Sequence, residues 1–151
     1  MEAVHLSAFE RVRLLNREEA RYLPAFERTV TKIGQGHRVM AQTSLGELIR
    51  PVSQGTNDKV AQNAFSSINS KRLDFAIIDR TGLLVCAVEY QGSGHYQGRA
   101  FIRDAVKKEA LRKAGVPVME VTQEETPDAA ASRLAAVLAK APDDTRKYGV
   151  A

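Results

Sequence analysis

Two carboxylates at the ends of consecutive apolar segments are the residues best placed to do chemistry. Asp74 lies near the start of RLDFAIID and Glu89 near the end of LLVCAVEYQ, and a short turn segment separates the two. If a hairpin closes through Thr81 and Gly82, residues equally distant from the turn face each other. Asp74 and Glu89 would then lie directly opposite, on one face, with Cβ atoms about 5 Å apart.

Two adjacent carboxylates repel each other unless a cation binds between them or one of them is protonated. Carboxylate oxygens, joined by the amide of Gln91, suit a hard ion such as Mg²⁺ or Mn²⁺ and not zinc. Alternatively, Asp74 and Glu89 cap strand ends or pair with Lys71 and Arg72. A three-residue loop would also shift the register by one residue and break the pairing.

The composition is that of a single soluble domain. The chain has 151 residues, 44% hydrophobic and 26% charged, which excludes a disulfide scaffold, a collagen-like fibre and a disordered tail. Its longest apolar runs, 83–88 and 134–139, are far shorter than the roughly 20 residues of a membrane-spanning helix. Because the N-terminal segment is charged and Cys86 is the lone cysteine, we expect no export signal, no membrane association and a cytoplasmic location.

The order of elements predicts a mixed α/β fold. Asn16 and Glu19 have the spacing of a capping box before a helix over about 17–29, in which Pro24 is an irregularity. A strand opening HRVMAQTSLGELI, a loop over 51–58 and a short helix near 60–65 precede the hairpin. A basic helix that ends at Gly115, the strand VPVMEV and a helix from Pro127 follow it. This order indicates a central sheet with helices on its faces.

Positive charge is concentrated in the predicted basic helix. The net charge of the chain is +4, and segment 99–113 alone carries six basic and two acidic side chains. Arg99, Arg103 and Lys107 recur every four residues and form one stripe, with Lys108 and Arg112 on the adjacent stripe. Such a stripe suits an anionic partner and can follow a phosphate backbone, although a solvated helix face is the alternative.

The hairpin resembles the site of a known nuclease superfamily. Asp74 at the head of one strand and Glu89-Tyr90-Gln91 at the end of the next are similar to the PD-(D/E)XK motif, with Gln91 where lysine is usual. The glutamine variant occurs among restriction endonucleases, so this difference does not by itself imply inactivity.

The chain more closely resembles a bacterial family classed as a domain of unknown function, which looks like the very-short-patch-repair endonucleases. The resemblance spans about 14–121 and rests on five features in order: LNREE with Tyr22, RLDFAIID, a strand ending in EYQ, His95 six residues after the glutamate, and RDAVKKEALRKAG before GVPVMEV. It implies a restriction-endonuclease-like mixed central sheet flanked by helices. We expect an N-terminal extension over 1–13, the nuclease-like domain over 14–141 and a polar tail over 142–151.

The resemblance implies metal-dependent hydrolysis of DNA phosphodiesters by a nuclease or nickase. Asp74 and Glu89 would bind Mg²⁺ or Mn²⁺, and Gln91 would orient the attacking water without acting as its base. Glu19 is the candidate third carboxylate, although its capping role is the alternative. His95 would contact a phosphate or protonate the leaving oxygen, unless it is a surface histidine with no role.

The basic helix supplies the remaining candidates. Lys107 or Lys108 would replace the missing motif lysine, and Lys108 is assigned to the catalytic set. DNA-binding roles are assigned to Arg99, Arg103, Lys107 and Arg112. Double-strand cleavage would favour a homodimer, and the small size also fits a domain within a larger nucleic-acid-processing complex. The rival hypothesis is an inactive nucleic-acid-binding or protein-interaction module on the same fold, with Gln91 as a sign of lost catalysis.

Overall fold

A four-stranded mixed sheet forms the centre of the structure, a computed structural model that describes residues 1–92 and 99–140. Its strands lie side by side in sequence order: β1 (Arg38–Ser44), β2 (Arg72–Ile78), β3 (Leu84–Gln91) and β4 (Val118–Thr122). The pairs β1–β2 and β2–β3 are antiparallel, whereas β3 and β4 are parallel. The predicted mixed α/β fold is confirmed.

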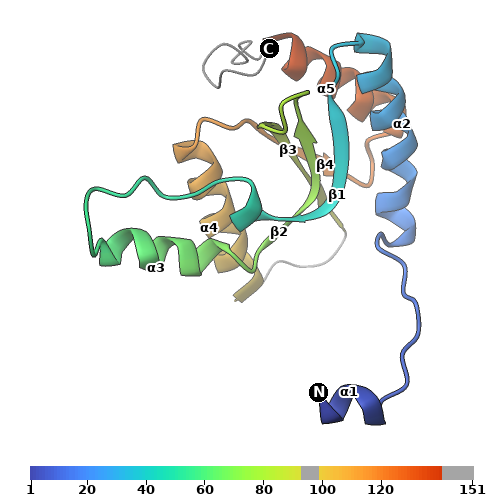
Figure 1. Cartoon of the computed structure of the whole chain (residues 1–151). Coiled ribbons are helices and arrows are strands. Elements are labelled where there is room, and N and C mark those ends of the chain that lie inside the picture. The colour runs from blue at the N-terminus through green and yellow to red at the C-terminus, as the bar shows by residue number, and fades with distance from the viewer. Residues whose placement is uncertain (93–98, 141–151) are drawn as a thin grey trace.

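Helices cover both faces of this sheet (Figure 1). The helices of the described chain are α1 (Glu2–Leu6), α2 (Arg17–Ile33), the 3₁₀ turn η1 (Leu45–Glu47), α3 (Lys59–Ile68), α4 (Arg99–Lys113) and α5 (Pro127–Lys140). The helices α2 and α5 pack together on one face, while α4, α3 and η1 lie on the other. Within the described part of the chain, no helix is long and apolar enough to cross a membrane.

The capping box that the sequence predicted begins α2. Asn16 Oδ1 accepts a hydrogen bond from the Glu19 backbone N–H at 2.8 Å, and Glu19 Oε2 accepts from the Asn16 N–H at 3.4 Å. Pro24 lies inside the helix without ending it. The helix extends past the predicted end near residue 29, because Gly34, with a φ of 72°, is the residue that adopts the left-handed conformation of a helix C-terminus.

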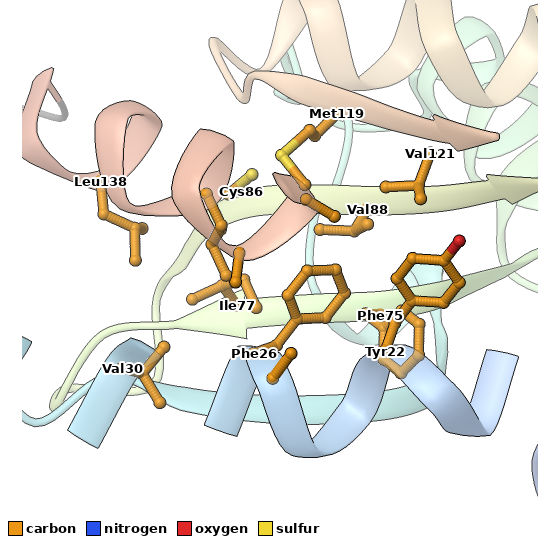
Figure 2. Packing of buried hydrophobic residues seen from close by; sticks show 14 residues of the cluster. Tyr22, Phe26, Val30, Phe75, Ile77, Cys86, Val88, Met119, Val121 and Leu138 are labelled. Atoms are coloured by element: carbon orange, nitrogen blue, oxygen red, sulfur yellow. The ribbon is translucent and has the colours of Figure 1, made fainter. Parts of the chain in front are cut away.

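The main hydrophobic core fills the space between the sheet and the helices α2 and α5 (Figure 2). The Phe26 ring is fully buried and meets the Phe75 ring edge-on, with 5.3 Å between the ring centres. Cys86 is buried in this core, and burial raises the pKa of its thiol to about 12. Tyr90 packs against the same cluster from the sheet end.

The second core cluster lies on the opposite face, beneath α4. It joins Leu111 of α4 to Ala76 and Ala87 at the centre of the sheet, with Leu45 and Ile68 at its edge. Asp74 and Glu89 belong to this face, because side chains two residues apart in a strand point the same way. Packing on both faces therefore fixes which way the two carboxylates point.

The predicted two-residue closure of the hairpin is wrong. The Asp79 N–H donates to the Leu83 carbonyl oxygen at 2.8 Å, so the turn contains three residues and not two. Asp79 Oδ1 stabilises this wider turn by accepting from the Thr81 backbone N–H at 2.8 Å and from the Leu83 N–H at 3.0 Å. By itself the added residue would shift the register by one.

A bulge in β3 restores the predicted pairing beyond this turn. Ile78 pairs with Leu84, but Ile77 pairs with Cys86, so Val85 is an extra residue in β3. Beyond the bulge Phe75 faces Val88, which is the register that the two-residue turn predicted. The two differences cancel, and Asp74 and Glu89 still lie next to each other.

The N-terminal segment lies apart from the sheet (Figure 1). It contains the short helix α1, which the sequence did not predict, and its large hydrophobic side chains are exposed; these are Met1, Val4, Leu6, Phe9, Val12 and Leu14. The predicted polar tail over 142–151 falls outside the described residues.

Candidate functional site

A polar cleft of about 550 Å³ opens at the end of the sheet where β2 begins and β3 ends. Carboxylates and cations line it together. Its lining residues are Glu19, Ser70, Lys71, Arg72, Asp74, Glu89, Tyr90, Gln91, Asp104 and Lys107. The cleft therefore collects side chains from α2, α4 and the two strands of the hairpin.

Asp74 and Glu89 are held together by hydrogen bonds across the hairpin. The Asp74 backbone N–H donates to Glu89 Oε2 at 3.1 Å, and the Tyr90 backbone N–H donates to Asp74 Oδ2 at 2.8 Å. Each carboxylate is thus oriented by the main chain of the opposite strand. The second oxygen of each group, Asp74 Oδ1 and Glu89 Oε1, meets a side-chain nitrogen instead.

Glu89 is a buried acid with a partly buried lysine beside it. Only 4% of Glu89 is exposed, and the Lys107 ammonium of α4 forms an ion pair with Glu89 Oε1. Lys107 also donates to the Arg72 carbonyl oxygen at 3.1 Å. Burial raises the pKa of Glu89 to about 7; the Lys107 charge opposes this rise and the Asp74 charge adds to it.

Gln42 of β1 connects Glu19 to Asp74, and no feature of the sequence predicted this. Its amide nitrogen lies 3.4 Å from Glu19 Oε2 and 3.5 Å from Asp74 Oδ1. Gln42 has a φ of 50°, a left-handed conformation that costs energy for a residue with a side chain. Such strain concentrates at functional sites, and here it accompanies a side chain that contacts two of the carboxylates lining the cleft.

Glu19 caps α2 and also lines the cleft. Its carboxylate completes the capping box with Asn16, and it contacts the Gln42 amide. Burial raises the pKa of Glu19, and the negative charge of Asp74 raises it further. Glu19 therefore adds a carboxylate to the cleft that contains Asp74 and Glu89.

The other predicted site residues are divided between the cleft and its surroundings. Gln91 lines the cleft, whereas Lys108 pairs with Asp104 at 3.1 Å and with Glu120 of β4. Arg112 pairs with Glu109 at 2.8 Å on the exposed side of α4. Of the two lysines considered for the missing motif lysine, the structure brings Lys107 to the carboxylates.

The side chains of three predicted site residues lie outside the described part of the structure. His95 lies outside the described residues. Arg99 and Arg103 belong to the first turns of α4, but their side chains are not among those that the structure describes.

The donor atoms of the cleft fit a hard divalent cation. Among residues 1–92 and 99–140, no group of three or more His, Cys, Asp or Glu side chains forms a metal site. Asp74 and Glu89 instead offer two carboxylates in a cleft that also contains the Gln91 amide. Mg²⁺ suits this arrangement, because in proteins it commonly binds one or two carboxylates and completes its shell with water and substrate phosphate.

The raised pKa of Glu89 predicts a pH-dependent stability of the metal-free protein. Between the ordinary pKa of 4.5 and about 7, folded Glu89 keeps a proton that the unfolded chain releases. Its stabilising contribution is therefore complete below about pH 4.5 and is lost as the pH rises through about 7. We expect the free energy of unfolding of the wild type to fall relative to Glu89→Gln over this range, measured by urea denaturation in EDTA. A difference that grows in favour of the wild type with rising pH would contradict this.

The sheet, its covering helices and the carboxylate cleft define a mixed α/β protein with an acidic site at one sheet end. Residues 11–140 match the family described as protein of unknown function (DUF2726), and the chain belongs to this family. The predicted membership of a family classed as a domain of unknown function is confirmed. No solved structure matches the chain significantly.

Two relatives are similar over most of this chain. An uncharacterized protein of Haemophilus influenzae is 41% identical over 120 residues, which cover 80% of this chain and 59% of that protein. This chain thus spans less than two thirds of the length of the Haemophilus protein. The uncharacterized protein y4bI of Sinorhizobium fredii is 39% identical over 137 residues, covering 91% of this chain and 94% of that protein.

Proposed function

We propose that this protein is a divalent-cation-dependent nuclease or nickase that hydrolyses DNA phosphodiesters, with a PD-(D/E)XK-type site on a restriction-endonuclease-like fold. The observation that carries the proposal is the hydrogen-bonded pair of Asp74 and Glu89, oriented by backbone N–H groups in a cleft that a lysine also enters. Two carboxylates beside a lysine are the groups needed to hold a cation and to receive a phosphate charge.

Asp74 and Glu89 would hold Mg²⁺ or Mn²⁺ through the oxygens that the backbone does not orient. Bound there, the ion would polarise the phosphodiester and lower the pKa of a water molecule. The backbone bonds from the opposite strands keep the two carboxylates in place while this happens. Preorganised groups of this kind contribute most when they need not move during the reaction.

The cations of the cleft would bind the DNA backbone. Lys71, Arg72 and Lys107 line the cleft together with the carboxylates. Lysine acts as a point charge for a phosphate, and arginine can donate two parallel hydrogen bonds to it. Binding through such contacts weakens with added salt, because each phosphate contact releases counterions.

Two polar side chains would orient the attacking water and accept its proton. Gln91 lines the cleft and can orient a water molecule by hydrogen bonding, although an amide is no base. The water oxygen bonds to phosphorus as the bond from phosphorus to the leaving sugar oxygen breaks. The water loses one proton, for which Glu19 is the candidate acceptor, and the leaving oxygen takes up one from solvent.

The test is conversion of supercoiled plasmid DNA to nicked circles by the purified protein. At low salt with Mg²⁺ or Mn²⁺, we expect nicked product that increases with protein and time, and none when EDTA replaces the metal. Direct conversion to linear DNA would indicate that two chains act together, one on each strand. DNA binding that is sensitive to salt but yields no cleavage with either ion would contradict the proposal and favour the inactive binding module.

A further inference from the structure

Side-chain nitrogens occupy the oxygens that a cation would use. Backbone N–H groups already donate hydrogen bonds to Glu89 Oε2 and Asp74 Oδ2. Lys107 Nζ meets Glu89 Oε1, and Gln42 Nε2 lies 3.5 Å from Asp74 Oδ1. The Lys107 ammonium therefore supplies the positive charge that two adjacent carboxylates require, in the position where a divalent ion would supply it.

Lys107 and a divalent cation cannot both be close to Glu89 without repelling each other. The contact is shielded from water, since the Lys107 side chain is 18% exposed and that of Glu89 is 5% exposed. Charges interact more strongly in such surroundings than at an open surface, so repulsion between the ammonium and a metal ion is large. A cation that binds here must therefore displace the ammonium.

A phosphate bound in the cleft would offer the ammonium an alternative partner. Lys107 lines the cleft with Lys71 and Arg72, the cations that would contact a phosphate. Its four-carbon stem is flexible and its ammonium can bond in several directions. A phosphate in the cleft would give Lys107 a new partner and leave Glu89 Oε1 to the metal.

We propose that Lys107 is an internal competitor of the divalent cation, so that metal and the DNA backbone bind this cleft cooperatively. The proposal rests on the proposed function, because it requires the Asp74–Glu89 metal site. It adds that the site binds metal only weakly until a phosphodiester draws Lys107 away. By reciprocity, metal then raises the affinity for DNA by the same factor as DNA raises the affinity for metal.

The experiment is a calorimetric titration of Mn²⁺ into the full chain, with and without a duplex oligonucleotide whose phosphorothioate linkages resist cleavage. In the wild type we expect the duplex to raise the Mn²⁺ affinity about tenfold or more. Lys107→Met keeps the length of the side chain without its charge, and should bind Mn²⁺ about tenfold more tightly than the wild type in the absence of DNA. The effect of the duplex should be clearly smaller in this variant, because only the direct ligation of Mn²⁺ by a phosphate remains.

Two further variants separate charge from structure. Lys107→Arg keeps the charge and should retain the weak affinity without DNA. Lys113→Met removes a charge from the exposed last turn of α4, at a residue with no role in the proposed site, and should leave both affinities close to wild type. Circular dichroism checks that each variant is folded. If Lys107→Met does not fold, Lys107→Gln, which can still donate to the Arg72 carbonyl oxygen, replaces it.

The outcomes distinguish this proposal from the proposed function. Equal Mn²⁺ affinity in the wild type and Lys107→Met, or weaker binding in the variant, would overturn the competition and leave the metal site intact. A failure of every protein to bind Mn²⁺, even with the duplex present, would overturn the metal site and the competition together.

Discussion

Asp74→Asn is expected to lower the rate of Mg²⁺-dependent DNA cleavage by about 10³-fold. The substitution removes one of the two charges that would hold the cation, whose stabilisation of the developing charge is worth several kcal/mol, or about tenfold for each 1.4 kcal/mol. The asparagine carbonyl can still accept the hydrogen bond from the Tyr90 backbone N–H, which is 2.8 Å in the wild type. We therefore expect the fold to survive, and initial rates of plasmid nicking measure the loss.

Asp128→Asn is the matched control for this substitution. Its side chain is 94% exposed in the first turn of α5, it does not line the cleft, and its contact with Arg28 is 4.0 Å long. Prepared in the same way, this variant should cleave at the wild-type rate. Equal rates for Asp74→Asn and the wild type would remove Asp74 from the mechanism and attribute the cleavage to another source.

Phe26→Ala is expected to lower the free energy of unfolding by about 3–5 kcal/mol, the cost of removing a large side chain from a close-packed core. Phe26 is 0% exposed and packs between the rings of Tyr22 and Phe75 (Figure 2). For a domain of this size the melting temperature should fall by about 10 °C, followed by circular dichroism.

Phe9→Ala removes the same side chain from an exposed position and is the control. Phe9 is 76% exposed in the N-terminal segment, so its loss should change stability by less than about 0.5 kcal/mol. If Phe26→Ala does not fold, Phe26→Leu should show a smaller loss in the same direction. A wild-type melting temperature for either Phe26 variant would contradict the described core.

The two strands of the hairpin, and the face on which each side chain lies, could be predicted because each strand has a strong local pattern of apolar residues. Two apolar runs separated by turn residues identified the hairpin, and side chains that alternate along β3 lie on opposite faces at Glu89 and Tyr90. The three-residue turn and the bulge at Val85 could not be predicted, because the turn depends on hydrogen bonds that the Asp79 side chain accepts and the bulge on the pairing of whole strands. The predicted pairing of the carboxylates is correct because the two differences compensate.

Three of the four carboxylates that line the cleft in the described part of the chain could be predicted from the sequence. Asp74 and Glu89 follow from the hairpin and Glu19 from the family resemblance, whereas Asp104 has no local signal that points to the cleft. Gln42 contacts Glu19 and Asp74 because β1 pairs with β2, and this pairing has no local sequence signal. The preference for Lys107 over Lys108 is decided by the rotation of α4 over the sheet, which helical spacing alone leaves open.

The most direct test of the central claim is uptake of Mn²⁺ from solution, followed by electron paramagnetic resonance in the presence of a non-cleavable duplex. The wild type should remove about one Mn²⁺ per chain beyond what the duplex alone removes, since two carboxylates and a phosphate complete the shell of one ion. The double variant Asp74→Asn/Glu89→Gln should remove none beyond the duplex. Equal uptake by the two proteins would contradict a metal site at Asp74 and Glu89.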